Sequence, residues 1–142
     1  MAKFRFDFLL QLALDEREEA AKKLQAAQSE WLAAQAKMAQ IDGYRSEYRN
    51  RLASNGQGGI TIAQWRDFQL FLTKLDAAAE QQASQLAGYE KRYQQMLKAW
   101  QECEKKVKGF EVLKDRHQQQ ELHKEGAREQ KMLDEFNSRR RQ

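Results

Sequence analysis

Apolar residues recur in alternating steps of four and three along two long segments of this 142-residue chain. Twelve of fourteen such positions are apolar over residues 6–52, and thirteen of fourteen over residues 65–110. The polar exceptions are Arg17, Arg45 and Gln82. A repeat of 3.5 residues held over nearly seven heptads is typical of a helix supercoiled against a partner helix. We expect the two arginines to extend their charged ends out of the apolar seam.

The stretch "SNGQGGIT", residues 54–61, separates the two segments and is rich in glycine. It has neither the closing Lys-Ser or Lys-Thr nor the preceding strand pattern of a phosphate-binding loop. Gly56 is placed to end a helix, because glycine accepts the left-handed conformation. Thr61 and Gln64 fit the capping box that opens a helix. The stretch therefore predicts a bend between two helices.

These signals together predict an all-α fold, a long two-helix antiparallel coiled-coil hairpin formed by residues 1–142 as a single unit. We expect helices over about 3–54 and 61–138, with the bend at 55–60. If the bend is centred near residues 57 and 58, the numbers of facing residues sum to about 115.

The second helix is then longer than the first, and residues 114–142 form an overhang. Lys114, His117 and Glu121 occupy the continued seam positions, so the heptad pattern fails there. A helix this polar is marginal without tertiary packing. We expect a partner to order it.

The composition sets limits on function. Charged residues make up 32% of the chain and the mean hydropathy is -0.95, so the apolar content suits a narrow core only. The net charge of +4 arises from interspersed acids and bases, which favours a solvated surface over a nucleic-acid face. Cys103 is the only cysteine, so no intrachain disulfide forms. No stretch approaches the roughly 18 apolar residues of a membrane span, so we expect no membrane insertion.

No catalytic, cofactor-binding or metal-binding residues are expected. His117 and His123 are six residues apart, about 240° around a helix, and cannot share a metal as an i, i+4 pair does. The sequence contains no recognisable Ser/His/Asp or Cys/His arrangement. A two-helix rod also offers no apolar pocket that raises the pKa of a carboxylate for acid-base work.

One flank of the hairpin carries aromatic residues that the seam does not require. Tyr44 and Phe71 both take heptad position g, and we expect them to face each other where a two-stranded coiled coil normally has charge. Their expected neighbours are Ile41, Tyr48, Leu75, Ala78 and, at the polar edge, Gln82. Two interpretations remain open, because this patch either binds a partner or thickens the seam near the bend.

A second group of apolar residues that the seam does not require lies at the open end of the hairpin, away from the bend. Phe4, Phe8 and Leu12 follow an i, i+4, i+8 row off the seam, and the overhang carries Met132, Leu133 and Phe136. These two groups either cover one another or enter a ring or groove on another protein.

Four segments in this order resemble the FliJ family: "KFRFDFLLQLALDEREEAA", "YRSEYRNRLASNGQGGITIAQWRDFQLFLTKLDAAAEQQ", "LKAWQECEKKVKGFEVLKDR" and "QKMLDEFNSRR". The resemblance implies a cytoplasmic component, peripheral at the base of the flagellum, of the bacterial flagellar type III export apparatus. It implies a coiled coil similar to the stalk of rotary ATPases. Its partners would be the hexameric export ATPase FliI, whose assembly and activity it promotes, the cytoplasmic domain of the export-gate protein FlhA, and the export chaperones that it helps recycle.

The resemblance also assigns binding residues. The gate surface corresponds to Ile41, Tyr44, Tyr48, Phe71, Leu75, Ala78 and Gln82. The ATPase contact corresponds to Phe4, Phe8, Leu12, Met132, Leu133, Asp134, Glu135, Phe136 and Arg139.

Other functions remain open at this point. The stalk of a virulence-type secretion system would share the hairpin and the kind of ATPase partner. A self-assembling structural coiled coil would form tetramers through Tyr44 and Phe71, whereas a stalk is expected to be a monomeric rod when free. A nucleic-acid reader, using Arg139, Arg140 and Arg141, would bind in a strongly salt-dependent way.

Overall fold

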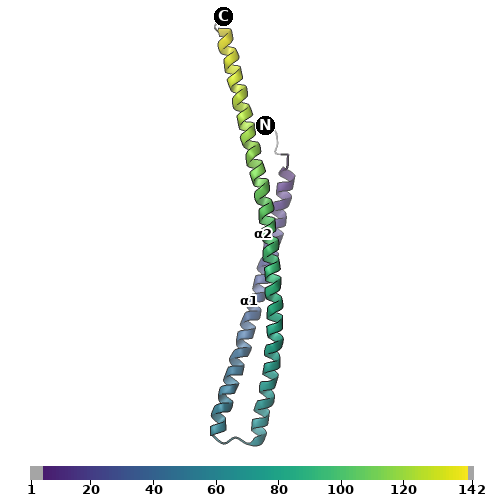
Figure 1. Ribbon diagram of the computed structural model, residues 1–142, viewed down its shortest axis with the longest axis vertical. Coiled ribbons are helices and arrows are strands. Elements are labelled where there is room, and N and C mark those ends of the chain that lie inside the picture. Colours follow the sequence, from purple (N-terminus) through teal and green to yellow (C-terminus); the bar gives the residue numbers. More distant parts are fainter. Residues whose placement is uncertain (1–4, 141–142) are drawn as a thin grey trace. The chain divides into compact units, whose positions relative to one another are not determined.

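The computed structural model describes residues 5–140 and, within them, the side chains outside residues 55–57. Two α-helices, α1 (Asp7–Gln57) and α2 (Ile62–Arg140), run antiparallel and pack against each other (Figure 1). No strand occurs in the described residues. The predicted all-α hairpin of two helices is confirmed.

The bend lies further along the chain than expected. Helix α1 continues to Gln57, beyond the predicted end at residue 54, so residues 58–61 make the reversal. Gly59 has a φ of 78°, a left-handed conformation that glycine adopts without a Cβ clash. The expectation that Gly56 ends the first helix is therefore wrong.

The predicted capping box is confirmed at the start of α2. The Gln64 backbone N–H donates to Thr61 Oγ1 at 3.2 Å. In return, the Thr61 backbone N–H donates to Gln64 Oε1, also at 3.2 Å. Two backbone donors that a helix N-terminus leaves without intrahelical partners are thus satisfied, and α2 begins at a defined residue.

Contacts divide the chain into two units where a single unit was expected. The terminal unit comprises residues 1–21 and 99–142, and the bend unit comprises residues 22–98. The core of the terminal unit is formed by Leu10, Ala13 and Val107, with Leu14 and Phe110 packed against it. Three ion pairs join the helices of this unit: Arg17 with Glu104 at 3.3 Å, Glu16 with Lys106 at 3.4 Å, and Asp7 with Lys114 at 3.5 Å.

The bend unit buries mostly small side chains. Its buried residues are Ala27, Ala34, Leu72, Ala79 and Gln82. Trp31 stacks on Tyr93, with ring centroids 5.0 Å apart. Large rings and alanines together fill the narrow interface between the two helices.

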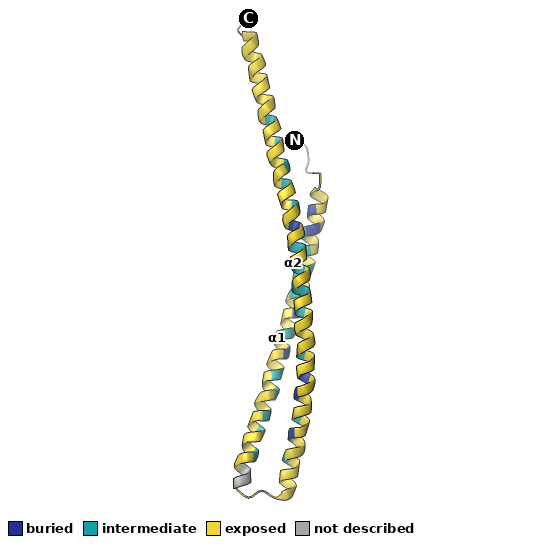
Figure 2. Cartoon of the chain, viewed as in Figure 1, coloured by how far each residue is buried: buried dark blue, intermediate teal, exposed yellow. Residues whose placement is uncertain are grey.

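The predicted seam positions coincide with the buried stripes of both helices (Figure 2). On α1, thirteen of the fourteen positions are buried or half-buried, and Phe6 is exposed. On α2, twelve of the fourteen positions are buried or half-buried, and Trp65 and Tyr89 are exposed. Arg17 and Arg45 are half-buried, and their guanidinium groups reach carboxylates of the opposite helix.

The pairing register differs from the predicted one. In the terminal unit, the paired Glu16 and Lys106 have numbers that sum to 122. In the bend unit, those of Arg45 and Asp76 sum to 121. The contacting rings of Tyr48 and Phe71 have numbers that sum to 119, which is also twice the centre of the reversal at residues 58–61. The expected sum of about 115 is therefore short by about four to seven residues, one to two helical turns. Seam positions recur every three or four residues, so a shift of this size still sets seam against seam, and periodicity alone does not distinguish the two registers.

Val107 and Val112 provide a matched test of the seam. Val107 is fully buried, whereas Val112, five residues further along α2, is 50% exposed. We expect Val107→Ala to lower the free energy of unfolding by about 2 kcal/mol, since it removes two buried methyl groups and leaves a cavity. Val112→Ala should change it by less than about 0.5 kcal/mol. Urea unfolding followed by circular dichroism at 222 nm measures both, and equal effects would contradict the assigned seam.

Candidate functional site

The structure separates the seven residues predicted for the gate surface by their exposure. Tyr44 is 47% exposed and Phe71 is 41% exposed, and Ala78 is also exposed. The half-buried members are Ile41, Tyr48 and Leu75. We call the six residues Ile41, Tyr44, Tyr48, Phe71, Leu75 and Ala78 the flank surface.

Gln82 does not belong to that surface. Its side chain is 4% exposed, and its Nε2 donates to the backbone carbonyl of Ala34 at 3.2 Å. Its assignment as a polar edge of the patch is therefore corrected. A buried amide needs a hydrogen-bond partner, and the carbonyl on the opposite helix supplies one.

An aromatic cluster forms the end of the flank surface nearest the bend. The ring centroid of Tyr48 lies 4.5 Å from that of Phe71 and 6.2 Å from that of Phe68. Gln64 and Asp67 join these three rings around a shallow open hollow. Gln64, Asp67 and Phe68 are not among the site residues predicted from the sequence. Heptad lettering could have found the first two, because Gln64 and Asp67 take positions g and c on the same flank as Phe71.

Tyr44 and Phe71 are not opposite each other as expected. Phe71 lies against Tyr48, which is one helical turn beyond Tyr44 on α1. The two exposed rings therefore share a flank but lie about one helical turn apart along it. The flank surface is longer and less concentrated than the sequence predicted.

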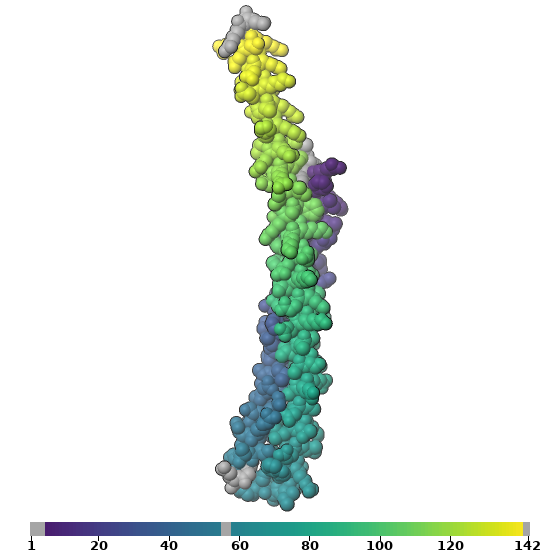
Figure 3. All heavy atoms as spheres, in the orientation of Figure 1, coloured from purple at the N-terminus to yellow at the C-terminus, as the bar shows by residue number. Residues whose placement is uncertain are grey.

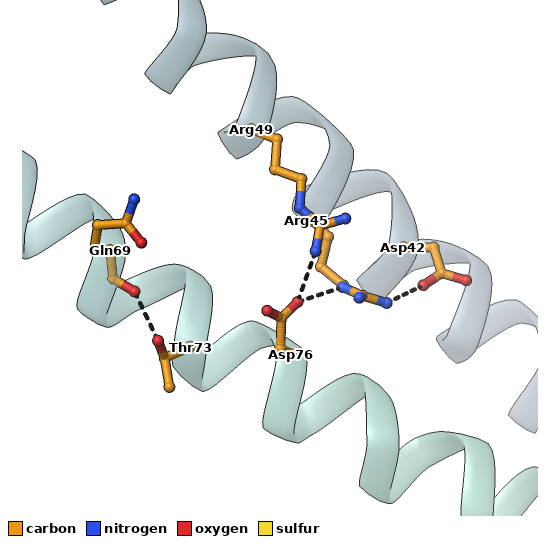
Figure 4. A network of polar contacts seen from close by, with 6 residues as sticks. All are labelled: Asp42, Arg45, Arg49, Gln69, Thr73 and Asp76. Atoms are coloured by element: carbon orange, nitrogen blue, oxygen red, sulfur yellow. Dashed lines mark hydrogen bonds and ion pairs between the residues drawn. The ribbon is translucent and has the colours of Figure 1, made fainter. Parts of the chain in front are cut away.

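Ion pairs join the two helices on the other edge of the seam, where Asp42, Arg49 and Asp76 take heptad position e. Asp76 of α2 accepts from Arg45 Nε at 2.9 Å and from Arg49 Nη2 at 3.1 Å, and Arg45 Nη1 also pairs with Asp42 at 3.1 Å (Figure 4). One carboxylate thus bridges two cations of the opposite helix. Because these groups are partly exposed, each pair contributes at most about 1 kcal/mol, but together they define which residues face each other.

The second candidate surface lies in the terminal unit. Near the start of α1, Asp7 pairs with Lys114 of α2 at 3.5 Å. Beyond it, α2 continues to Arg140, and Figure 3 shows that the segment near the C-terminus, drawn in yellow, is not covered by α1. We call residues 115–140 the terminal segment.

Every described residue of the predicted ATPase contact is exposed. These are Phe8, Leu12, Met132, Leu133, Asp134, Glu135, Phe136 and Arg139, whereas Phe4 lies outside the described residues. Phe8 is 78% exposed and Phe136 is 61% exposed, so the two groups of apolar residues do not cover one another. Leu9, Leu113 and Leu122 are further exposed apolar residues of this unit that the sequence analysis did not select. The arrangement leaves apolar surface free for another molecule.

The described residues contain neither a metal site of clustered side chains nor a membrane span. No group of three or more His, Cys, Asp or Glu side chains is placed to hold a metal ion. Neither helix contains an apolar window long enough to cross a bilayer.

Comparison with known proteins gives consistent matches. The family model described as "Flagellar FliJ protein" matches residues 1–142. The flagellar FliJ proteins of Escherichia coli and Salmonella typhi are each 30% identical to this chain over 131 residues, which is 92% of this chain and 89% of theirs. A proposed YscO homolog from Chlamydia trachomatis has a TM-score of 0.49 and 13% identity, covering 97% of this chain and 94% of that one, a likeness too slight to bear on fold or function.

The exposures of Tyr44 and Tyr48 predict different effects on stability. Tyr48 packs on two rings, so Tyr48→Ala should lower the free energy of unfolding by about 1–2 kcal/mol. Tyr44→Ala removes an exposed ring and should change it by less than about 0.5 kcal/mol. Urea unfolding of both variants measures the difference. A strong loss of stability in Tyr44→Ala would mean that this ring belongs to the seam.

Proposed function

Because this chain belongs to the FliJ family of flagellar proteins, we propose that it is a non-enzymatic stalk of the flagellar type III export apparatus. In this role it acts in the cytoplasm at the base of the flagellum. It binds the hexameric export ATPase FliI through the open end of the terminal unit and promotes assembly and ATP hydrolysis. It binds the cytoplasmic domain of the gate protein FlhA through the flank surface, and it takes part in the recycling of export chaperones.

The observation that carries the proposal is the exposed apolar surface of the terminal segment. Met132, Leu133 and Phe136 are all more than half exposed on a helix that has no α1 partner there. Nothing in the hairpin requires large apolar groups at these positions. Apolar side chains at helical spacing on a single helix suit insertion into a groove or ring of another protein.

The flank surface supports the gate contact by a similar argument. A two-stranded coiled coil normally has charged residues at positions g, but Tyr44 and Phe71 stand there and remain exposed. Exposed aromatic residues are frequent anchors of protein interfaces. The ion pairs around Asp76 hold this surface in one alignment before any partner binds.

ATP hydrolysis tests the ATPase contact. We expect the chain to stimulate the cognate hexameric export ATPase, and we expect Leu133→Ala with Phe136→Ala to raise the concentration for half-maximal stimulation about tenfold, which corresponds to about 1.4 kcal/mol. Leu32→Ala is the matched control, because Leu32 is 54% exposed but lies in the bend unit. Failure of the unmodified chain to stimulate hydrolysis would refute the stalk role.

Calorimetric titration with the isolated FlhA cytoplasmic domain tests the gate contact. Tyr44→Ala and Ala78→Glu should each weaken binding about tenfold, since one removes an aromatic anchor and the other adds a charge on the same flank. Leu70→Ala is the control, because Leu70 is 59% exposed and lies outside the flank surface. Unchanged affinity in both test variants would show that the gate binds elsewhere.

A further inference from the structure

The terminal segment has two chemically different faces. At about 100° per residue, Leu122, Leu133 and Phe136 fall within an arc of about 60°, and Met132 extends this arc to about 100°. All four are exposed, by 62%, 56%, 61% and 68% respectively. They form a single apolar row along the helix.

Acidic residues lie within the same arc. Glu125 and Glu129 fall between the apolar residues, and Asp115 continues the face toward the start of the segment. Arg140, at the end of α2, is the one base among the described residues of this arc, so the face carries three carboxylates against one guanidinium. Within residues 5–140, the side chains of Glu125 and Glu129 make no ion pair or hydrogen bond, whereas Glu121 pairs with Lys124 at 3.8 Å and Asp134 accepts from Gln130 Nε2 at 3.1 Å. We call the face defined by Leu122, Glu125, Glu129, Met132, Leu133 and Phe136 the acidic-apolar face.

The opposite side of the helix carries more bases than acids. Lys124 and Lys131 fall about 130–150° from the centre of the apolar row and Arg128 about 90° from it, and Asp134 and Glu135 lie on the same side. This side has no large exposed apolar residue, and exposed charges without apolar anchors contribute little to affinity. Asp134 and Glu135 also fall outside the apolar arc, although they lie between Leu133 and Phe136 in the sequence.

We propose that the acidic-apolar face is the side of the terminal segment that docks, into a groove of the ATPase ring with apolar pockets and a rim of Lys or Arg side chains. This inference rests on the proposed stalk function and specifies its contact. The spacing of Glu129, Met132, Leu133 and Phe136 is i, i+3, i+4, i+7, which is the pattern of a helix laid into a groove. The net negative charge of the row favours Lys or Arg side chains at the rim of the groove, because acidic side chains there would repel the row.

The proposal changes which residues should matter. Leu122, Glu125 and Glu129 are then expected to contact the ATPase, although they lie outside residues 133–136, the stretch "LDEF". Asp134 and Glu135 lie within that stretch but are expected to make no contact. The face of the helix, rather than adjacency in sequence, selects the contact.

Charge reversal on the two faces tests the proposal in the ATP hydrolysis assay with the full chain. Glu125→Lys with Glu129→Lys should raise the concentration for half-maximal stimulation about tenfold. Lys124→Glu with Lys131→Glu reverses the same number of charges on the opposite face and should stay within about twofold. Circular dichroism confirms that each variant remains as helical as the unmodified chain.

Two further readouts separate contact from general charge effects. Raising the ionic strength from low to physiological should weaken stimulation by the unmodified chain more than stimulation by the Glu125→Lys and Glu129→Lys variant, because its favourable pairs are screened. Leu122→Ala should weaken stimulation, whereas Asp134→Lys with Glu135→Lys should not.

The outcomes distinguish the two proposals. If the unmodified chain does not stimulate the ATPase, the stalk function and the docking face both fail. If it stimulates and the basic-face variant is the more impaired, the stalk function stands and the acidic-apolar docking face is wrong. If the acidic-face variant is the more impaired and Leu122→Ala is also weakened, the docking face is supported.

Discussion

The structure depends on one narrow apolar seam between α1 and α2. The chain is 32% charged, and the described residues buried in its interior are few and mostly small. Almost all hydrophobic stabilisation must therefore come from layers such as Leu10, Ala13 and Val107 in the terminal unit and Ala34 and Ala79 in the bend unit. A seam this thin has no neighbouring core to compensate for a poorly filled layer. The ion pairs at its edges add little energy, but they select one alignment of the two helices.

The periodic features of the fold could be predicted from the sequence. A 3.5-residue repeat identifies which side of each helix is buried, because burial follows directly from helix geometry. The capping box at Thr61 and Gln64 could also be predicted from the sequence, since both partners lie within four residues of each other. The exposed apolar residues Phe8, Met132, Leu133 and Phe136 followed from the same lettering, as large side chains off the seam or beyond its end.

The pairing between the helices was less predictable, for a physical reason. Moving one helix by a heptad restores every seam contact, so the repeat that identifies the seam leaves its register open. Long-range pairs such as Arg45 with Asp76, together with the position of Gly59 in the bend, distinguish the registers. Gln82 shows the same limit at a single residue. A glutamine in an apolar repeat suggests a position at the polar edge of the apolar surface. Here its amide donates to the Ala34 carbonyl across the seam and is buried.

The short link at residues 58–61 determines how the seam responds to dilution. Two separate helices with so many alanines at their interface would pair only above some concentration. Joined by a few residues, they meet at an effective concentration on the order of millimolar, which does not change when the protein is diluted. Pairing is then a first-order process within one molecule. A chain of this design keeps its hairpin however few copies are present, and its exposed aromatic and acidic-apolar surfaces stay available for other molecules.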